Sequence, residues 1–360
     1  MKKEMARRSS YSIIILILFI AGCGQEQYES SMQNTADEPA VATHGMVSAA
    51  HPLATKAGLD ILKAGGNAFD AAVAIAAMLN VVEPMMSGIG GYGTIVVYDA
   101  SEGKAHFLNC SGRIPEAVNS DAFRAPTPNF KENRRGAKAV STPGNVNAWE
   151  AMSKRFGSMQ WSRLFDAAIR TAEEGFEISQ RTAGLIGRAF PSFPDHAKAI
   201  YGKSGESLEQ GGMLIQRDLA SSLRLIAEHG AQVVHGGELG KAIDAVMREA
   251  DGFLSLEDLR KNTAEWWEPI SVNYRGYEVI TASPPSTAFP SIIRLGLMSR
   301  FDNGALDHNT TGYLHRFAEV TKHAFWCRLR HAGSPEYNNP PLEMLLSEQY
   351  WEDQVAKIDP

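Results

Sequence analysis

The residue best suited to bind a small anionic group is Arg113, which lies in the segment 110–116, CSGRIPE. A guanidinium presents a fork of N–H donors that matches the two oxygens of a carboxylate. The strand-like run 105–109 precedes it, so the arginine is expected just beyond the end of a strand. An arginine in an ordinary surface turn is the alternative, and the residue types leave both interpretations open.

A second chemically suggestive pattern is the G-x-G-x-x-G spacing of Gly88, Gly90 and Gly93. A dinucleotide-binding loop of this spacing follows a strand and opens a helix. Here the helical pattern 68–82 precedes the glycines and the strand-like run 94–98 follows them. The context therefore argues against nucleotide binding. It predicts instead that the glycines allow close backbone packing beside a substrate pocket, or form a tight turn.

The histidines do not have the spacing of a metal site. Four of them are seven or eight residues apart, whereas paired zinc ligands lie closer together: His308, His315, His323 and His331. His51, directly before a proline, is expected to make a local hydrogen bond. The sequence contains no G-x-S-x-G, H-E-x-x-H or phosphate-loop motif. We therefore predict no metal and no cofactor.

The N-terminus has the pattern of a secretory signal. Basic residues precede the apolar run 11–20, YSIIILILFI, which is too short for a comfortable membrane span. Ile20-Ala21-Gly22-Cys23 follows and resembles the lipobox of bacterial lipoproteins, which predicts a signal peptide at 1–22 and lipidation of Cys23. An ordinary cleaved signal is the alternative. An aspartate directly after the cysteine is the usual signal that retains lipoproteins in the inner membrane, and this chain has Gly24 there. We therefore expect a lipid-anchored protein of the bacterial cell envelope, on the periplasmic side of the outer membrane.

The amino-acid composition limits the domain organisation, the class of partner and the disulfide content. Residues 23–43 are polar and predict a flexible tether, so the folded domain is expected at 44–360. The net charge of −6 argues against general nucleic-acid binding. Three cysteines exclude a disulfide scaffold but leave one bridge, Cys110–Cys327, open beside the alternative of free buried thiols.

Periodicity predicts a mixed α/β (α+β) fold with much helix. Asn67 should cap a helix at 68–82 that is buried nearly all round. Hairpins are predicted at 94–109 and 270–281, the second with a two-residue turn. A long helix is expected at 309–331. Its predicted inner stripe is Leu314, Phe317, Ala318, Thr321, Ala324 and Phe325.

Several short sequence motifs, which follow one another in a fixed order, resemble those of a known family. HPLA, ILKAGGNAFDAAVA, VVEP and SGIGGYG stand between residues 51 and 93, and PIS…YRGYEV follows at 269–279. This series resembles the γ-glutamyltranspeptidase family, whose relatives include acylases. The resemblance implies an N-terminal-nucleophile hydrolase with a four-layer αββα sandwich. It also implies that an arginine near residue 113 holds the α-carboxylate of a γ-glutamyl group.

The match at the arginine departs from the usual family word. Typical members place the arginine four residues before the proline, where this chain has Ser111. Arg113 lies two residues before Pro115, and this S-G-R-x-P form resembles a less typical branch. The sequence therefore leaves two substrate classes open, namely γ-glutamyl compounds and compounds with a different acyl group.

The resemblance covers the family's large segment only. In the family the nucleophile is a threonine in a T-T-H-like word, freed at the start of the small segment when the precursor cuts itself. The chain ends at Pro360 before such a word, so we name no catalytic residue and expect an incomplete sandwich. The leading hypothesis is a large segment that, with a separately encoded small segment, hydrolyses or transfers γ-glutamyl groups such as that of glutathione. A catalytically inactive binding lipoprotein and a truncated gene product are the alternatives.

Overall fold

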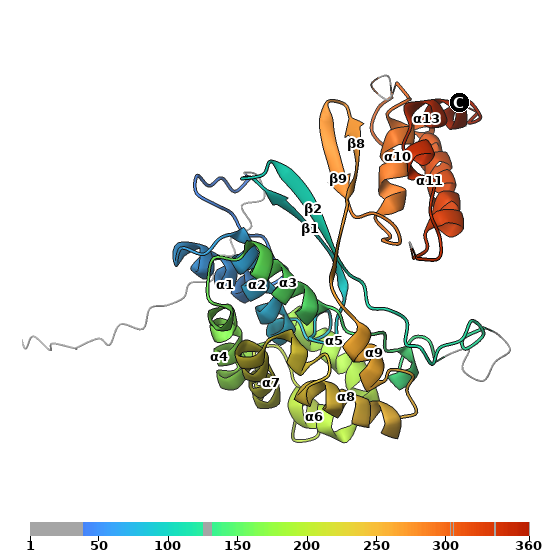
Figure 1. Cartoon of the computed structure of the whole chain (residues 1–360). Coiled ribbons are helices and arrows are strands. Elements are labelled where there is room, and N and C mark those ends of the chain that lie inside the picture. Colours follow the sequence, from blue (N-terminus) through green and yellow to red (C-terminus); the bar gives the residue numbers. More distant parts are fainter. Residues whose placement is uncertain (1–38, 125–131, 303, 305, 335, 360) are drawn as a thin grey trace, which may run out of the picture. The chain divides into compact units, whose positions relative to one another are not determined.

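A computed structural model describes residues 39–124, 132–302, 304, 306–334 and 336–359 (Figure 1). The chain divides into residues 1–44 and a second unit, Gly45–Pro360, to which the following description applies. The signal peptide predicted at 1–22, Cys23 and most of the predicted tether lie outside the described residues. Within the described part, no helix is both long and apolar enough to span a membrane.

The helical pair that begins this unit forms for local reasons. Helix α1, Pro52–Lys63, starts at His51, whose Nδ1 accepts a hydrogen bond from the Leu53 N–H at 3.2 Å, as the sequence predicted. Helix α2, Ala68–Val82, has a capping box between Asn67 and Asp70. None of residues 69–82 is exposed, which confirms that α2 is buried on nearly all sides.

The first predicted hairpin leads into a three-stranded antiparallel sheet. Strands β1, Gly93–Asp99, and β2, Lys104–Cys110, pair with Gly93 opposite Cys110, and β7, Glu265–Trp267, adds to the free edge of β2. Because β2 ends where β1 begins, the glycine-rich turn before β1 and the S-G-R segment after β2 meet at one end of the sheet. The sheet thereby brings together two segments that the sequence analysis had singled out separately.

The other elements of this first core are mainly helices. They are α3 Asn145–Phe156, α4 Asp166–Glu174, α5 Gln180–Ala189, α6 Asp195–Tyr201, α7 Arg217–His229, α8 Glu238–Glu249 and α9 Leu256–Lys261. Two short ribbons pair β3 Phe176–Glu177 with β6 Met213–Leu214, and β4 Gly202–Lys203 with β5 Glu206–Ser207. Single 3-10 turns occupy Ala137–Ala139, Trp161–Phe165, Phe190–Ser192 and Ala231–Val233. The core buries side chains of α2, β2, α3, α4 and α7.

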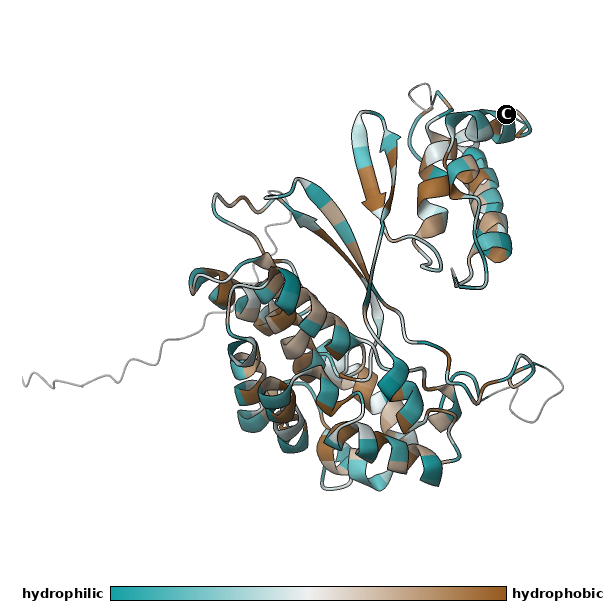
Figure 2. Ribbon diagram, in the orientation of Figure 1, coloured by the Kyte–Doolittle hydropathy of each residue, from teal (hydrophilic) through white to brown (hydrophobic). Residues whose placement is uncertain are grey.

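A second apolar core lies in the last third of the chain. Strands β8, Ile270–Tyr274, and β9, Tyr277–Thr281, form the hairpin that the sequence predicted. It packs with helices α10 Phe289–Met298, α11 Thr311–His331, α12 Leu342–Leu345 and α13 Glu348–Val355. Figure 2 shows apolar segments in brown on both α10 and the hairpin. Each core thus combines helices with a β-structure, and the α+β prediction is confirmed.

The predicted inner stripe of α11 is wrong in most of its members. Val320, Ala324 and Cys327 are buried, whereas Leu314, Phe317 and Phe325 are 50%, 42% and 47% exposed. The helix has two partly apolar faces, and hydrophobicity alone favoured the one with the larger side chains. The face that packs inward carries small ones instead. The Cys110–Cys327 bridge is not formed, since both thiols are free and buried.

Candidate functional site

Arg113 follows β2, and its backbone is held by a close approach at Gly112. A Cβ atom on Gly112 would lie 1.7 Å from the Thr142 carbonyl oxygen, so only glycine fits there. The Thr142 hydroxyl donates a 2.7 Å hydrogen bond to the Arg113 carbonyl. The Arg113 N–H donates to the Asn262 Oδ1 at 3.3 Å. The main chain at the arginine is therefore held from two sides.

Asn262 is the residue of this site that the sequence analysis missed. It is buried, and its Nδ2 donates to the Pro143 carbonyl at 2.9 Å. Its own carbonyl accepts from the Asn147 Nδ2 at 2.6 Å. These bonds tie α9, α3 and the segment after β2 together at the arginine. No local pattern marks Asn262, because its partners lie 115 to 149 residues away along the chain.

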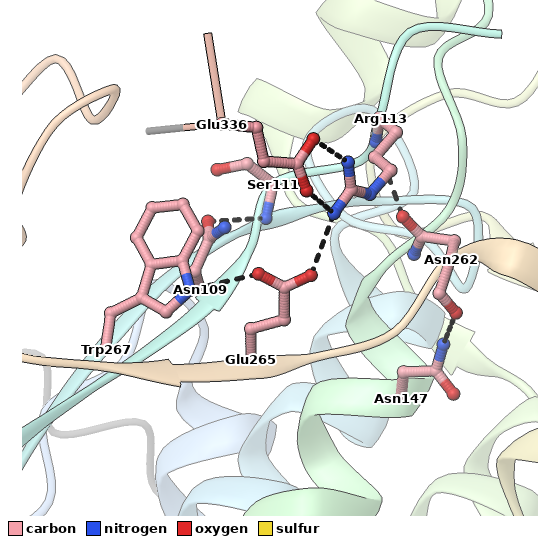
Figure 3. A network of polar contacts seen from close by, with 8 residues as sticks. All are labelled: Asn109, Ser111, Arg113, Asn147, Asn262, Glu265, Trp267 and Glu336. Atoms are coloured by element: carbon pink, nitrogen blue, oxygen red, sulfur yellow. Dashed lines mark hydrogen bonds and ion pairs between the residues drawn. The ribbon is translucent and has the colours of Figure 1, made fainter. Parts of the chain in front are cut away.

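The guanidinium of Arg113 is engaged by two carboxylates (Figure 3). Its Nη1 and Nη2 donate to the two oxygens of Glu336 at 3.0 and 2.8 Å, and Nη2 also donates to Glu265 at 3.0 Å. The second oxygen of Glu265 accepts from the Trp267 indole at 2.9 Å. The hydrogen bonds to Glu336 and then Glu265 raise the pKa of Arg113, and the Arg113 hydrogen bond lowers the pKa of Glu336.

This geometry shows what Arg113 can do chemically. It already binds one carboxylate through two parallel N–H···O bonds, which is the arrangement a carboxylate ligand would need. The side chain is 47% exposed, so a small molecule can reach it. Glu336 and the ligand would compete for the same N–H groups, whereas Glu265 bonds from another side. The Arg113 guanidinium thus holds the internal carboxylate of Glu336, and its binding of a substrate carboxylate stays a prediction.

The glycine-rich turn lies against the start of α3. A Cβ on Gly91 would lie 2.4 Å from the Asn145 Nδ2, and that nitrogen donates to the Gly88 carbonyl at 3.2 Å. The Gly144 N–H donates to the Gly91 carbonyl at 2.9 Å. A helix precedes the turn and a strand follows it, which is the order opposite to a dinucleotide loop. Close packing here requires a glycine at Gly91, whereas a Cβ on Gly90 or Gly93 would meet no atom within 4 Å.

The described residues offer no activated thiol. Burial raises the pKa of Cys110 to about 11, and its thiol donates to the Gly93 carbonyl at 3.1 Å. Cys327 lies 3.6 Å from both the His323 Nε2 and the Tyr350 hydroxyl, yet burial raises the pKa of Cys327 and lowers that of His323. Both groups are thus favoured in their neutral forms. Among the described residues no three histidine, cysteine or carboxylate side chains are placed to hold a metal.

Known proteins are similar to this chain in fold and in sequence. Residues 54–360 match the family model of gamma-glutamyltranspeptidase. A solved γ-glutamyltranspeptidase from Helicobacter pylori superposes with a TM-score of 0.85 at 31% identity, over 90% of this chain and 94% of that one. The fold is that of the N-terminal-nucleophile hydrolases, as predicted. The chain belongs to the γ-glutamyltranspeptidase family.

The names of two similar curated proteins state different activities. The chain is 32% identical over 328 residues to the glutathione hydrolase proenzyme of Bacillus subtilis (strain 168). It is 35% identical over 332 residues to the acylase ACY 1 proenzyme of Pseudomonas sp. (strain V22). The matches cover 89% of this chain but 55% and 59% of those proteins. The chain therefore spans little more than half the length of these relatives.

Proposed function

We propose that this chain is the large segment of an enzyme that hydrolyses or transfers γ-glutamyl groups of glutathione or related amides. The family match and the partial coverage of the proenzymes support this assignment. The nucleophile is then a threonine at the start of a small segment, and the reaction proceeds through an acyl-threonine intermediate. The observation that carries the proposal is the Arg113 fork, which binds a carboxylate in the geometry that the α-carboxylate of a γ-glutamyl group requires.

An acylase that acts on a different acyl group is the second candidate. Two observations favour it, namely the similarity to ACY 1 and the occupancy of the Arg113 fork by Glu336. Arg113 and the two carboxylates of Glu265 and Glu336 together have a net negative charge, which disfavours a second carboxylate at this place. An acyl group without a carboxylate would leave these contacts intact. The catalytically inactive binding protein remains the alternative in which no threonine segment completes the site.

The two candidates differ in their expected substrates. The full chain would be co-expressed with a threonine-initiated small segment, encoded nearby or taken from the Bacillus subtilis relative. The γ-glutamyl enzyme should cleave γ-glutamyl p-nitroanilide much faster than butyryl p-nitroanilide, which has no carboxylate. The opposite order would support the acylase. A purified complex that cleaves neither would support the inactive binding protein and contradict both enzyme assignments.

We expect Glu336→Gln to lower KM for the γ-glutamyl anilide by roughly two- to fivefold, since an exposed ion pair of this kind contributes about 1 kcal/mol or less. The change removes an internal competitor for Arg113 but leaves Glu265 in place. Steady-state kinetics of the assembled enzyme measure the effect. Glu343→Gln is the control, because it removes an exposed carboxylate elsewhere in the same part of the chain. An unchanged KM with Glu336→Gln would show that Glu336 does not compete with the substrate.

We further propose that the protein is anchored to the membrane through lipidated Cys23, with residues 1–22 removed. The supporting observation is the basic and apolar start of the chain followed by Ile20-Ala21-Gly22-Cys23. Multiple acyl chains on Cys23 would hold the protein stably in a bilayer. In bacteria that express the chain, Cys23→Ser should move it from the membrane fraction to the soluble fraction. Retention of the variant in the membrane fraction would contradict the anchor.

A further inference from the structure

Two carboxylates hold the Arg113 guanidinium in different ways (Figure 3). Glu336 accepts from Nη1 and Nη2 at once, and it belongs to the connection between α11 and α12. Glu265 accepts a further hydrogen bond from Nη2, and it belongs to strand β7. A substrate carboxylate that takes the two bonds of Glu336 leaves the bond to Glu265 in place. Glu265 is therefore the partner that holds the arginine while a ligand is bound.

The strand that carries Glu265 is fixed by the sheet. In the pairing of β7 with β2, Glu265 lies opposite Asn109 and Trp267 lies opposite Phe107. Residues two apart on a strand point to the same face, so the side chains of Glu265 and Trp267 are neighbours. The Trp267 indole N–H donates to Glu265 Oε2 at 2.9 Å, whereas Oε1 accepts from Arg113 at 3.0 Å. Each oxygen of this carboxylate thus has its own donor.

The indole itself is held by a buried aromatic ring. It meets the Phe107 ring edge to face, with centroids 6.0 Å apart and an interplanar angle of 87°. Phe107 is 1% exposed. Edge-to-face contact is a preferred geometry of aromatic pairs, and a tryptophan side chain has few torsions to fix. A continuous series of contacts therefore runs from the buried Phe107 through Trp267 and Glu265 to the guanidinium.

The flexibility of the two charged side chains makes this support important. Ordering an arginine side chain costs conformational entropy, which weakens ligand binding unless the side chain is ordered beforehand. The carboxylate of a glutamate rotates easily about its last bond, because that torsion has a broad energy minimum. The indole N–H of Trp267 restricts this rotation in Glu265. It thereby keeps Oε1 directed at the arginine.

From these contacts we propose that Trp267 is a positioning residue of the carboxylate site. Through Glu265 it keeps the outer N–H groups of Arg113 directed at the place that a substrate carboxylate takes from Glu336. The inference rests on the proposed function, in which that carboxylate belongs to a γ-glutamyl group. Trp267 is better suited to a test than Glu265, because loss of Glu265 also removes a negative charge that repels the substrate carboxylate.

Trp267→Phe tests the proposal, because phenylalanine keeps an aromatic ring and lacks the indole N–H. In the assembled enzyme, KM for γ-glutamyl p-nitroanilide should rise roughly three- to tenfold, with kcat changed by less than about twofold. KM for 4-aminobutyryl p-nitroanilide, which has no α-carboxylate, should not change. An unchanged KM for the γ-glutamyl substrate, or an equal rise for both substrates, would overturn the proposal.

Trp266→Phe is the matched control. Trp266 is the neighbouring residue of β7, its side chain points to the opposite face, and its ring centre lies 4.6 Å from the guanidinium carbon of Arg155. This variant should leave KM for both substrates unchanged. In a chain that already carries Arg113→Gln, Trp267→Phe should change KM by less than about twofold, because the indole acts through the arginine. The same rise in KM with and without Arg113 would contradict a positioning role.

A second measurement needs no enzyme activity. In the full chain with Glu336→Gln, Glu265 is the carboxylate that remains on Arg113. Phenylglyoxal modification of Arg113 is then followed by mass spectrometry of the peptide that contains it. Addition of Trp267→Phe should speed this modification roughly two- to fivefold, whereas addition of Trp266→Phe should not. Equal rates with and without Trp267→Phe would overturn the positioning role, even in an enzyme that cleaves the γ-glutamyl anilide.

Failure of the proposed function has a different signature. A parent complex that does not cleave the γ-glutamyl anilide would contradict the proposed activity. Faster modification of Arg113 by Trp267→Phe in the same protein would still support the positioning of the arginine.

Discussion

Replacement of Arg113 by glutamine is expected to lower kcat/KM of the assembled enzyme for γ-glutamyl p-nitroanilide by roughly a hundredfold. The variant loses the fork that binds the α-carboxylate, and two charged hydrogen bonds of this kind account for a loss of that size. The substitution should leave the main chain in place, because Thr142 and Asn262 bond to the backbone carbonyl and N–H of residue 113, which glutamine retains. Steady-state kinetics with the complete enzyme provide the measurement.

Two controls separate substrate binding from general damage. Cleavage of 4-aminobutyryl p-nitroanilide, which lacks the α-carboxylate, should be nearly the same for the variant and the parent. Arg163→Gln, at an exposed arginine of the first core, should leave both activities unchanged. If Arg113→Gln slowed both substrates equally, the arginine would have a structural role and would not bind the carboxylate.

Replacement of Asp70 by alanine is expected to lower the free energy of unfolding by about 3 kcal/mol. Asp70 is 0% exposed, and its carboxylate accepts from the Ser158 hydroxyl at 2.7 Å and from the N–H groups of Ser158 and Asn67 at 3.1 and 3.0 Å. These bonds join the start of α2 to the segment after α3. The variant leaves several buried donors without an acceptor, and urea unfolding of the full chain measures the loss.

The effect of Asp70 should depend on pH in a defined direction. Burial acts to raise the pKa of Asp70, but the hydrogen bonds from Ser158, Asn67 and Met159 outweigh it and hold the pKa below its usual value. The stabilisation is therefore complete above the unfolded pKa of about 4 and is lost as the pH falls through the lower folded value. Parent and variant should differ by a constant amount from pH 8 to about pH 5 and converge in stronger acid.

Asp60→Ala is the matched control for the Asp70 variant. Asp60 lies on α1 with a half-exposed side chain, and its ion pair with Lys56 is of a kind that contributes about 0.5 kcal/mol or less. A loss for Asp70→Ala no larger than that of Asp60→Ala would show that the buried carboxylate does not hold the two segments together.

Features with local causes were predictable from the sequence. Asn67 and the apolar run after it specify α2, because a side-chain cap and helical periodicity act over a few residues. The hairpin of β8 and β9 follows from its two-residue turn, in which Arg275 and Gly276 both have positive φ. The position of Arg113 beyond the end of β2 followed from the strand pattern before it in the same way.

Features that depend on distant partners were not predictable. Glu336 lies 223 residues from Arg113, and nothing near either residue indicates their ion pair. Asn262 likewise reaches the site only through the folded chain. On α11, Phe317 and Phe325 satisfied a helical pattern, but the inward face is chosen by what α10 can accommodate. Periodicity shows that a helix has an apolar face, and the packing partner decides which face is buried.

The most direct test of the account is the site of acylation in the assembled enzyme. The full chain, co-purified with a threonine-initiated small segment, would be mixed with γ-glutamyl p-nitroanilide, quenched in acid and analysed by mass spectrometry. The account predicts a γ-glutamyl adduct on the first threonine of the small segment, with strongly reduced occupancy when the chain carries Arg113→Gln. An adduct on the 360-residue chain itself, or turnover without any adduct on that threonine, would contradict it.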